Sequence, residues 1–209
     1  MATIAGTAHS MKKMIALSLL LLMLGSVGAA VRLPQEVIQD TSAQMIDALR
    51  KNSAALRQDS SRIYELVEQI VLPNFDFQLM SRWVLGRAWQ QATAEQRRLF
   101  ADEFRTLLVR TYAKALLEYA DQDIRVPPQP PASSDQTTVR TEVQPKTGRP
   151  IQINYSMNLG PQGWKVYDVT VDSVSLVTNY RSTFASQIRN NGLDAVIADL
   201  RQRNAQGGR

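Results

Sequence analysis

The chain has 209 residues, with 24 Lys and Arg against 19 Asp and Glu, no Cys, and a single His, His9. This composition provides no disulfide framework and no Cys nucleophile, and residues 10–209 contain no His for a Ser–His–Asp triad or for a zinc or haem site. The net charge of +5 is not concentrated in a basic stripe, so nucleic-acid binding is not indicated.

Residues 11–30 have the pattern of an export signal. Two lysines precede an apolar run over residues 14–24, and three small residues follow that end at Ala30. The apolar run is shorter than the roughly 18 residues that a membrane anchor needs. The chain has no Cys at the expected cleavage point that a lipid could modify.

We therefore expect a signal peptide region over residues 1–30, with Met11 as an alternative start, and one domain over residues 31–209. Removal of the signal would also remove His9, which leaves a domain with neither Cys nor His. Catalysis in such a domain would depend on carboxylates, Lys or Tyr.

Apolar spacing predicts two helices at the start of this domain. The first opens at Leu33-Pro34, because proline is tolerated in a first helical turn. Its apolar stripe consists of Val37, Ile38, Met45 and Leu49. The second helix covers residues 59–72 and is stopped by Pro73.

Capping patterns predict where the next two helices begin. Asp76 caps a short helix that runs to Leu85 and is closed by Gly86. Thr93-Ala94-Glu95-Gln96 is a capping box, and the helix that it starts runs to about Ala120. This is the longest expected element, and aromatic and aliphatic residues follow one of its faces.

A period of two residues replaces the helical spacing after the proline-rich stretch 127–131. Residues 137–144 and 151–159 alternate between apolar and polar side chains, and a third strand is expected over residues 164–171. The turns between them predict an antiparallel meander. Because one face is polar, we expect only one side of the sheet to pack against the core.

Helical spacing returns at the end of the chain. Leu176, Tyr180, Phe184 and Ile188 lie four residues apart, and Asn191-Gly192 closes that helix. A last helix is expected over residues 193–200, and residues 204–209 are expected to fray.

Motifs for phosphate binding and catalysis are missing from the sequence. It contains no glycine-rich nucleotide loop and no nucleophile elbow. Asp121-Gln122-Asp123 begins like a calcium loop but lacks the required Gly and Glu. Asp168 and Asp172 are candidates for acid–base work, although surface carboxylates are far commoner than catalytic ones. We therefore expect no enzyme activity, no cofactor and no metal site.

The amphipathic long helix and the half-polar sheet must bury facing surfaces. They could form an ordinary packed core, or they could stand apart and enclose an apolar cavity. Periodicity alone leaves both interpretations open.

An ordered set of short motifs resembles the MlaC (toluene-tolerance) family over nearly the whole domain. The set consists of Leu79-Met80-Ser81, Val84-Leu85-Gly86, Trp89, Thr93-x-Glu95-Gln96, Phe100, Phe104, Thr111-Tyr112, Gly163 to Val169, Val174 to Val177, Tyr180-Arg181 and Phe184. One departure is Ser173, where the family usually has Gly after an acidic residue.

The resemblance implies an α+β fold in which a twisted antiparallel sheet of about four strands is wrapped by helices and encloses an apolar lipid pocket. It implies a monomeric periplasmic carrier in a Gram-negative cell, with bound phospholipid as cargo and a role in outer-membrane lipid asymmetry. The implied partners are an inner-membrane ABC lipid transporter complex and an outer-membrane lipoprotein–porin complex.

Ten residues are our candidates for the lipid-binding pocket wall. They are Phe104, Leu108, Tyr112, Leu116, Ile151, Ile153, Tyr155, Tyr167, Val169 and Val171. Trp164 and Val166 point to the other sheet face unless a β-bulge intervenes. Two alternatives stay open: a cavity-type hydrolase or isomerase that uses Asp and Tyr, and a periplasmic chaperone or adaptor without a small ligand.

Overall fold

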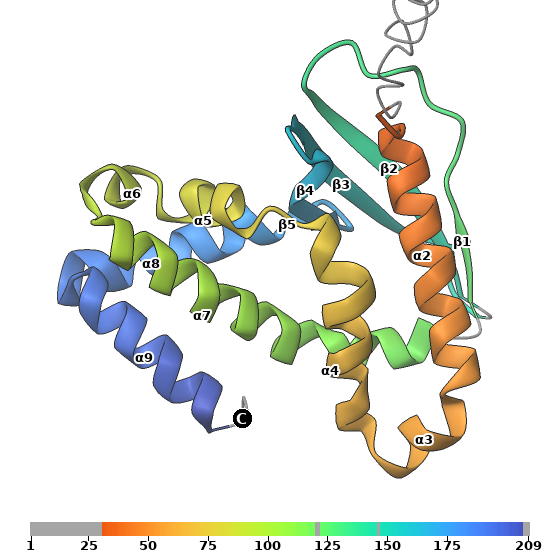
Figure 1. Ribbon diagram of the computed structural model, residues 1–209, viewed down its shortest axis with the longest axis horizontal. Helices are drawn as coiled ribbons and strands as arrows, with labels where there is room; N and C mark the ends of the chain where they lie inside the picture. Colours follow the sequence, from red (N-terminus) through yellow and green to blue (C-terminus); the bar gives the residue numbers. More distant parts are fainter. Residues whose placement is uncertain (1–30, 120–121, 146, 207–209) are drawn as a thin grey trace, which may run out of the picture. The chain divides into compact units, whose positions relative to one another are not determined.

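A computed structural model of the chain describes residues 31–119, 122–145 and 147–206 (Figure 1). Residues 32–209 form one compact unit of the chain. The expected signal peptide and its cleavage site lie outside the described residues. None of the helices that are described is both long and apolar enough to cross a membrane.

The first helices begin as expected and then become irregular. Helix α2 (Pro34–Lys51) opens with proline in its first turn, and α3 (Ser53–Gln58) follows it. The single helix expected over residues 59–72 is instead a mixed segment. It consists of the 3-10 turn η2 (Ser60–Arg62), α4 (Ile63–Leu66), the π-helix η3 (Val67–Val71) and the 3-10 turn η4 (Leu72–Asn74).

Capping side chains begin the next helices where the sequence predicts. Asp76 Oδ1 accepts the N–H of Leu79 at 2.8 Å and starts α5 (Phe77–Leu85). At Gly86, φ is +54°, and the short helix α6 (Arg87–Gln91) begins directly after this corner. The capping box at Thr93 starts α7 (Ala94–Tyr112), which continues as the 3-10 helix η5 (Ala113–Tyr119). The expected long helix therefore has the expected length but changes its hydrogen-bonding pattern near its end.

The sheet is antiparallel, which confirms the expected α+β class, and it has five strands where about four were expected. Its spatial order follows the chain: β1 (Asp123–Arg125), β2 (Gln136–Gln144), β3 (Ile151–Gly160), β4 (Gly163–Val171) and β5 (Val174–Ser175). β1 and β5, for which the alternation pattern predicted no strand, are short and lie at the edges of the sheet.

A β-bulge interrupts the register between β3 and β4. Ser156 pairs with Asp168, and the next residue of β3, Met157, pairs with Val166, so Tyr167 is an additional residue in β4. The bulge reverses the phase of the strand, and Val166 therefore shares a sheet face with Tyr155 and Met157. This is the exception that the alternation pattern left open.

The chain ends with α8 (Leu176–Asn191) and α9 (Leu193–Ala205). Fraying from residue 204 onward was expected, but Asn204 lies within α9 and is only 6% exposed. Its Nδ2 donates to the carbonyl oxygen of Glu103 at 2.9 Å and to Glu103 Oε2 at 2.8 Å. These bonds fasten the end of α9 to α7.

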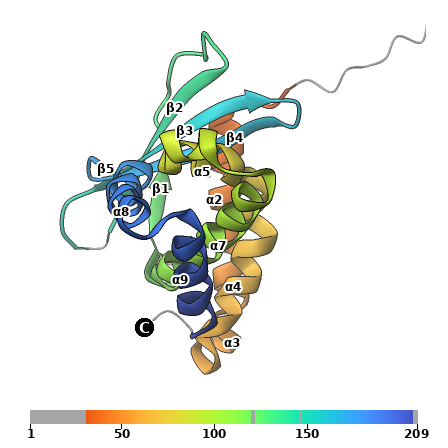
Figure 2. The same cartoon turned by 90° about the vertical axis from the view of Figure 1, so that its left-hand side faces the viewer.

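Three buried clusters hold these elements together. In the first, α5, α7, α8 and α9 pack around Phe100, Phe104 and Phe184 (Figure 2). The second joins α2 to one face of the sheet. The third joins α2, α3, η5 and the mixed segment of residues 60–74, which we call the α4 segment. The polar face of the sheet is also partly covered, because α5 and α8 both contact β4.

Candidate functional site

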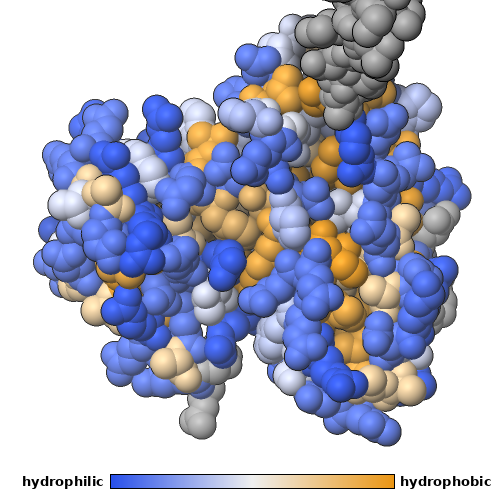
Figure 3. All heavy atoms as spheres, viewed as in Figure 1, coloured by the Kyte–Doolittle hydropathy of each residue, from blue (hydrophilic) through white to orange (hydrophobic). Residues whose placement is uncertain are grey.

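An apolar cavity of about 120 Å³ lies between α2, the η3–η4 segment, η5 and one face of the sheet. Thirteen residues line it: Ile38, Thr41, Ser42, Met45, Ile46, Leu49, Val71, Asn74, Phe75, Leu116, Ile124, Tyr155 and Val166. Hydrophobic side chains also gather on the molecular surface in the furrow between α2 and the α4 segment (Figure 3). The cavity is therefore bordered by apolar surface on the side where these two helices meet solvent.

The lining of the cavity carries no formal charge among the described residues. Ile38, Met45 and Leu49 of α2 supply much of the wall, and they belong to the apolar stripe predicted for this helix. Such a lining offers hydrocarbon contacts and very few directional bonds. It suits an apolar ligand better than a polar substrate.

Two polar side chains of the lining, Thr41 and Asn74, are bonded to the protein itself. Asn74 Nδ2 donates to Thr41 Oγ1 at 2.9 Å and to the carbonyl oxygen of Ile70 at 3.1 Å. Thr41 Oγ1 in turn donates to the carbonyl oxygen of Val37 at 2.7 Å. These bonds tie α2 to η4 and leave few free donors facing the cavity.

Tyr155 presents its aromatic ring to the cavity from β3. Burial raises the pKa of Tyr155 to about 12, and a hydrogen bond with Thr141 opposes that shift. Thr141 Oγ1 donates to the carbonyl oxygen of Ile153 at 3.0 Å, which holds the threonine in place. The phenol therefore stays neutral at physiological pH, and the cavity stays uncharged.

Two walls of the cavity are helices of irregular type. Val71 belongs to the π-helix η3, in which the N–H of Leu72 donates to the carbonyl of Val67. Leu116 belongs to the 3-10 helix η5, which has seven residues. Runs of 3-10 helix this long are uncommon, and π-helical turns often occur at functional sites. A shift of the hydrogen bonds by one residue would convert either segment to α-helix, so we expect these two walls to be the more deformable part of the lining.

Of the ten predicted wall residues, Leu116 and Tyr155 line the cavity. Val169 packs against the second buried cluster, which joins α2 to the sheet beside the cavity. Ile153 and Val171 pair across β3 and β4 on the same sheet face, but Val171 lies at the strand end and is 38% exposed. The β3 strand thus brings part of the predicted wall to the cavity.

The structure places Phe104 and Leu108 in the helical cluster, away from this cavity. The Phe104 ring lies 5.2 Å from that of Tyr180 and 5.9 Å from that of Phe184. Their positions on α7 face α8 and α9, whereas the cavity meets the continuation of this helix at Leu116. Helical periodicity identifies an apolar face but does not specify which neighbour covers it.

The remaining candidates also lie outside the cavity lining. Tyr112 is 39% exposed and forms a hydrogen bond with Tyr180. Tyr167, the additional residue of the bulge, stacks on Trp83 with ring centroids 6.3 Å apart. Ile151 pairs with Val143 at the start of β3 and is partly buried.

Several lining residues were not predicted as pocket residues. Ile38, Met45 and Leu49 were identified as part of the apolar stripe of the first helix, but they were not among the predicted pocket residues. Val166 was placed on the other face because the bulge is not visible in the alternation pattern. Phe75 and Val71 lie where the chain changes from helix to strand pairing, and the N–H of Asp76 donates to the carbonyl of Val166 at 2.8 Å there.

Known proteins are similar to this chain over most of its length. A family model described as MlaC protein matches residues 39–202. Toluene tolerance protein ttg2D of Pseudomonas putida is 28% identical over 167 residues, which cover 79% of this chain and 77% of that protein. The intermembrane phospholipid transport system binding protein MlaC of Haemophilus influenzae is 24% identical over 177 residues, which cover 83% of each chain.

A solved structure is also similar. The phospholipid-binding protein from Ralstonia solanacearum, determined in complex with a phospholipid, superimposes with a TM-score of 0.77 and 29% identity. The match covers 85% of this chain and 100% of that chain.

Proposed function

Since the chain belongs to the MlaC family, we propose that it binds phospholipid and carries it across the periplasm. The acyl chains would occupy the cavity between α2 and the sheet, and phospholipid would be cargo rather than cofactor. The carrier would exchange lipid with an outer-membrane lipoprotein–porin complex and an inner-membrane ABC transporter, and so maintain outer-membrane lipid asymmetry. We propose that it acts as a monomer after removal of residues 1–30.

The observation that carries this proposal is the uncharged, mainly aliphatic lining of the cavity. Burial of hydrocarbon contributes about 0.8 kcal/mol per methylene, so two long acyl chains represent on the order of 20 kcal/mol relative to water. Exchange between a bilayer and an apolar cavity replaces hydrocarbon by hydrocarbon, and the net free-energy difference can be small. A carrier needs that small difference, because it must both load and release.

The cavity must widen to admit a phospholipid. A cavity of about 150 Å³ holds a molecule of the size of benzene, and this one measures about 120 Å³. An acyl chain is several times larger than benzene, so α2 or the irregular helices must move away from the sheet. The π-helix η3 and the 3-10 helix η5 support this step, because each is a wall that can rearrange without unfolding the helical cluster.

Two relatives support the choice of ligand. The Haemophilus protein is named for intermembrane phospholipid transport, and the Ralstonia protein was solved with a phospholipid. We propose that Leu116, Tyr155 and the α2 stripe contact the acyl chains directly. Ile153 and Val169 extend this surface along the sheet, and Phe104 and Leu108 stabilise the helices behind it.

No observation favours the alternative functions at this site. An Asp- and Tyr-dependent hydrolase or isomerase needs a carboxyl group in its cavity, and the described lining contains none. Asp168 instead binds the start of α8, where its Oδ1 accepts the N–H of Val177 at 3.0 Å and its Oδ2 accepts from Ser175 Oγ at 2.6 Å. An adaptor without a ligand would not explain the cavity.

The proposal predicts that filling the cavity blocks lipid transfer. Ser42 lines the cavity from α2, whereas the neighbouring residue Ala43 is exposed to solvent. Overpacking a site costs about 1–3 kcal/mol, so Ser42→Trp should weaken phospholipid binding roughly ten- to hundredfold. The measurement is the rate at which the protein transfers a fluorescent phospholipid between donor and acceptor vesicles.

Ala43→Trp is the matched control, because it adds the same side chain one residue away on the solvent side of the helix. It should transfer lipid at the wild-type rate. Equal transfer by a folded Ser42→Trp variant and by the control would contradict the proposed lipid site.

A further inference from the structure

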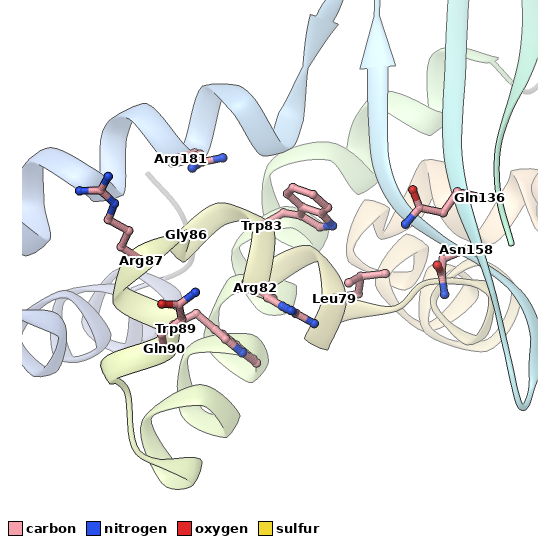
Figure 4. A pocket seen from close by; sticks show the side chains of 10 residues that line it. All are labelled: Leu79, Arg82, Trp83, Gly86, Arg87, Trp89, Gln90, Gln136, Asn158 and Arg181. Atoms are coloured by element: carbon pink, nitrogen blue, oxygen red, sulfur yellow. The ribbon is translucent and has the colours of Figure 1, made fainter.

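A second, larger cavity lies at the corner between α5 and α6. It measures about 590 Å³ and is bounded by this corner, by α8 and by the adjoining ends of β2 and β3. Arginines from three positions line it, Arg82, Arg87 and Arg181, and we call it the arginine cleft. Figure 4 shows Arg87 and Arg181 on the α8 side of the corner, with Arg82 across the α5 helix from them.

The arginine cleft is separate from the apolar cavity. Its strand residues are Gln136 and Asn158, which pair across β2 and β3. Asn158 lies three residues after Tyr155 in a continuous register with β2, so the two side chains point to opposite faces of the sheet. The inference below therefore does not depend on the proposed lipid site.

The cleft carries an uncompensated positive charge. Its described lining contains three guanidinium groups and no carboxylate. In the part of the chain that the structure describes, none of these three guanidinium groups has an ion pair or a hydrogen bond. All three arginines are exposed to solvent, and their summed charge gives the cleft a positive potential, which favours an anionic ligand.

Two neighbouring arginines have partners within the protein. Arg97 Nε donates to the carbonyl oxygen of Trp89 at 2.9 Å, and its guanidinium lies 5.3 Å from the centroid of the Trp89 ring. Arg98 forms ion pairs with Glu95 at 2.7 Å and with Asp102 at 3.1 Å. The three cleft arginines have no such partner within the described residues, so their donors are open to an anion from solvent.

Gly86 allows one of these guanidinium groups to approach the backbone closely. A Cβ at residue 86 would lie 3.1 Å from Arg181 Nη2, and the φ of +54° at Gly86 also disfavours any side chain. Arg181 of α8 therefore packs directly over the α5–α6 corner. This contact keeps its guanidinium at the cleft without neutralising it.

We propose that the arginine cleft binds the phosphate group of a phosphate monoester. Guanidinium forks match phosphate oxygens in pairs, and a dianion balances more of this charge than a single carboxylate does. The volume falls within the range of about 300–1,000 Å³ that is typical of small-molecule sites. Arg181 and Arg87 hold the phosphate, and Trp83 and Leu79 contact the rest of the ester.

Two sources offer this chemistry. One is a soluble phosphate monoester, and the other is a phosphomonoester headgroup displayed on a bilayer. Trp83 is 44% exposed in the cleft, and exposed tryptophan next to arginine is also suited to a bilayer surface. The two sources are distinguished by presenting the same phosphate group free in solution and in a vesicle.

The experiment titrates the full protein with glycerol 3-phosphate and follows binding by calorimetry and by tryptophan fluorescence. Sodium chloride at equal ionic strength corrects for general screening. In a second arm, the protein is sedimented with phosphatidylcholine vesicles that contain phosphatidic acid, and with vesicles of phosphatidylcholine alone. Binding in the first arm identifies a soluble ester, and binding only to phosphatidic acid vesicles identifies a headgroup.

Arg181→Gln and Arg87→Gln should each weaken binding about ten- to hundredfold, because each removes a hydrogen-bond donor to a charged group. Arg189→Gln is the matched control, since it removes the same charge from an exposed position two turns further along α8. Arg181→Lys keeps the charge but loses the fork, so it should bind with intermediate affinity. Circular dichroism establishes which variants are folded.

Three outcomes would overturn the proposal. They are no binding in either arm, equal weakening by Arg189→Gln, and capture of an acidic peptide in preference to both phosphate probes. Phospholipid content of the Arg181→Gln variant should equal that of the wild type. A failure of the lipid proposal therefore leaves a different signature from a failure of this one.

Discussion

At the scale of single residues, neutrality of the apolar cavity depends on how its polar side chains are bonded. Thr41 and Asn74 bond to each other and to backbone carbonyls. Tyr155 is the titratable group in the described lining, and burial raises the pKa of its phenol to about 12. Below that pH the tyrosine remains protonated in the folded protein.

Tyr155 therefore lowers the free energy of unfolding at high pH. Its pKa is about 12 when folded and about 10 when unfolded, so the unfolded chain loses the proton first as pH rises. The free energy of unfolding is therefore unaffected by this group well below pH 10, and it is lower by about 1 kcal/mol near pH 11. Tyr180 shifts in the same direction, so the effect must be isolated by a variant.

Tyr155→Phe should remove this loss. Urea unfolding at pH 8 and pH 11 should show a smaller decrease in the free energy of unfolding for the variant than for the wild type. Equal decreases in the two proteins would contradict the assigned burial of the phenol.

The turn between β4 and β5 contains two residues with positive φ, Asp172 at 44° and Ser173 at 73°. A side chain in this left-handed region costs about 1–2 kcal/mol, whereas glycine adopts it freely. Ser173→Gly should therefore raise the free energy of unfolding by about 0.5–1 kcal/mol, measured by urea denaturation.

Ser182→Gly provides the control, since Ser182 is exposed within α8 and has a helical conformation. The same substitution should there lower stability by about 0.5 kcal/mol. If both variants lose stability, the turn is not strained at Ser173.

At the scale of elements, helices with explicit caps were predicted well. Asp76 and Thr93 start α5 and α7 as the sequence indicates. These caps could be predicted because each side-chain acceptor lies only three residues before the N–H that it binds. The segment 59–72 was less predictable. Its change from α to π and 3-10 helix depends on Pro73 and on pairing of Phe75 with Val166, and the latter contact joins residues far apart in the sequence.

The join between the sheet and α8 depends on one carboxylate. Asp168 of β4 accepts from Ser175 Oγ at 2.6 Å and from the N–H of Val177 at 3.0 Å, and Ser175 itself caps α8 by accepting from Thr178 at 3.0 Å. Asp168→Ala leaves these donors without their acceptor. It should lower the free energy of unfolding by about 1–3 kcal/mol in urea denaturation.

Asp199→Ala is the comparison for this prediction. Asp199 forms an exposed ion pair with Arg203 at 2.6 Å within α9. Such pairs contribute little, so this variant should differ from the wild type by less than about 0.5 kcal/mol. Similar unfolding midpoints for the two variants would show that Asp168 does not stabilise the join.

At the scale of the whole unit, residues 32–209, the α+β class and the meander were predictable, because they follow from local periods and turns. The cavity lining was predictable only in part. Leu116 and Tyr155 were identified, but Phe104 and Leu108 face a helical cluster. Three residues of the α2 stripe, Ile38, Met45 and Leu49, line the cavity instead. The hydrophobic period of one helix or strand shows that it has an apolar face. It does not show which distant element packs against that face.

The sheet thus separates two different environments. One face borders a neutral apolar cavity, and the other borders a cleft with three arginines. We propose that the first face holds the cargo of the carrier, and that the second face recognises phosphate.

Organic extraction of the purified protein, followed by mass spectrometry and quantification of bound lipid, tests the central claim most directly. The proposal predicts phospholipid in stoichiometric amount in the wild type and in Ala43→Trp, with little in Ser42→Trp. A folded wild-type protein that yields no phospholipid, and takes none up from vesicles, would contradict it.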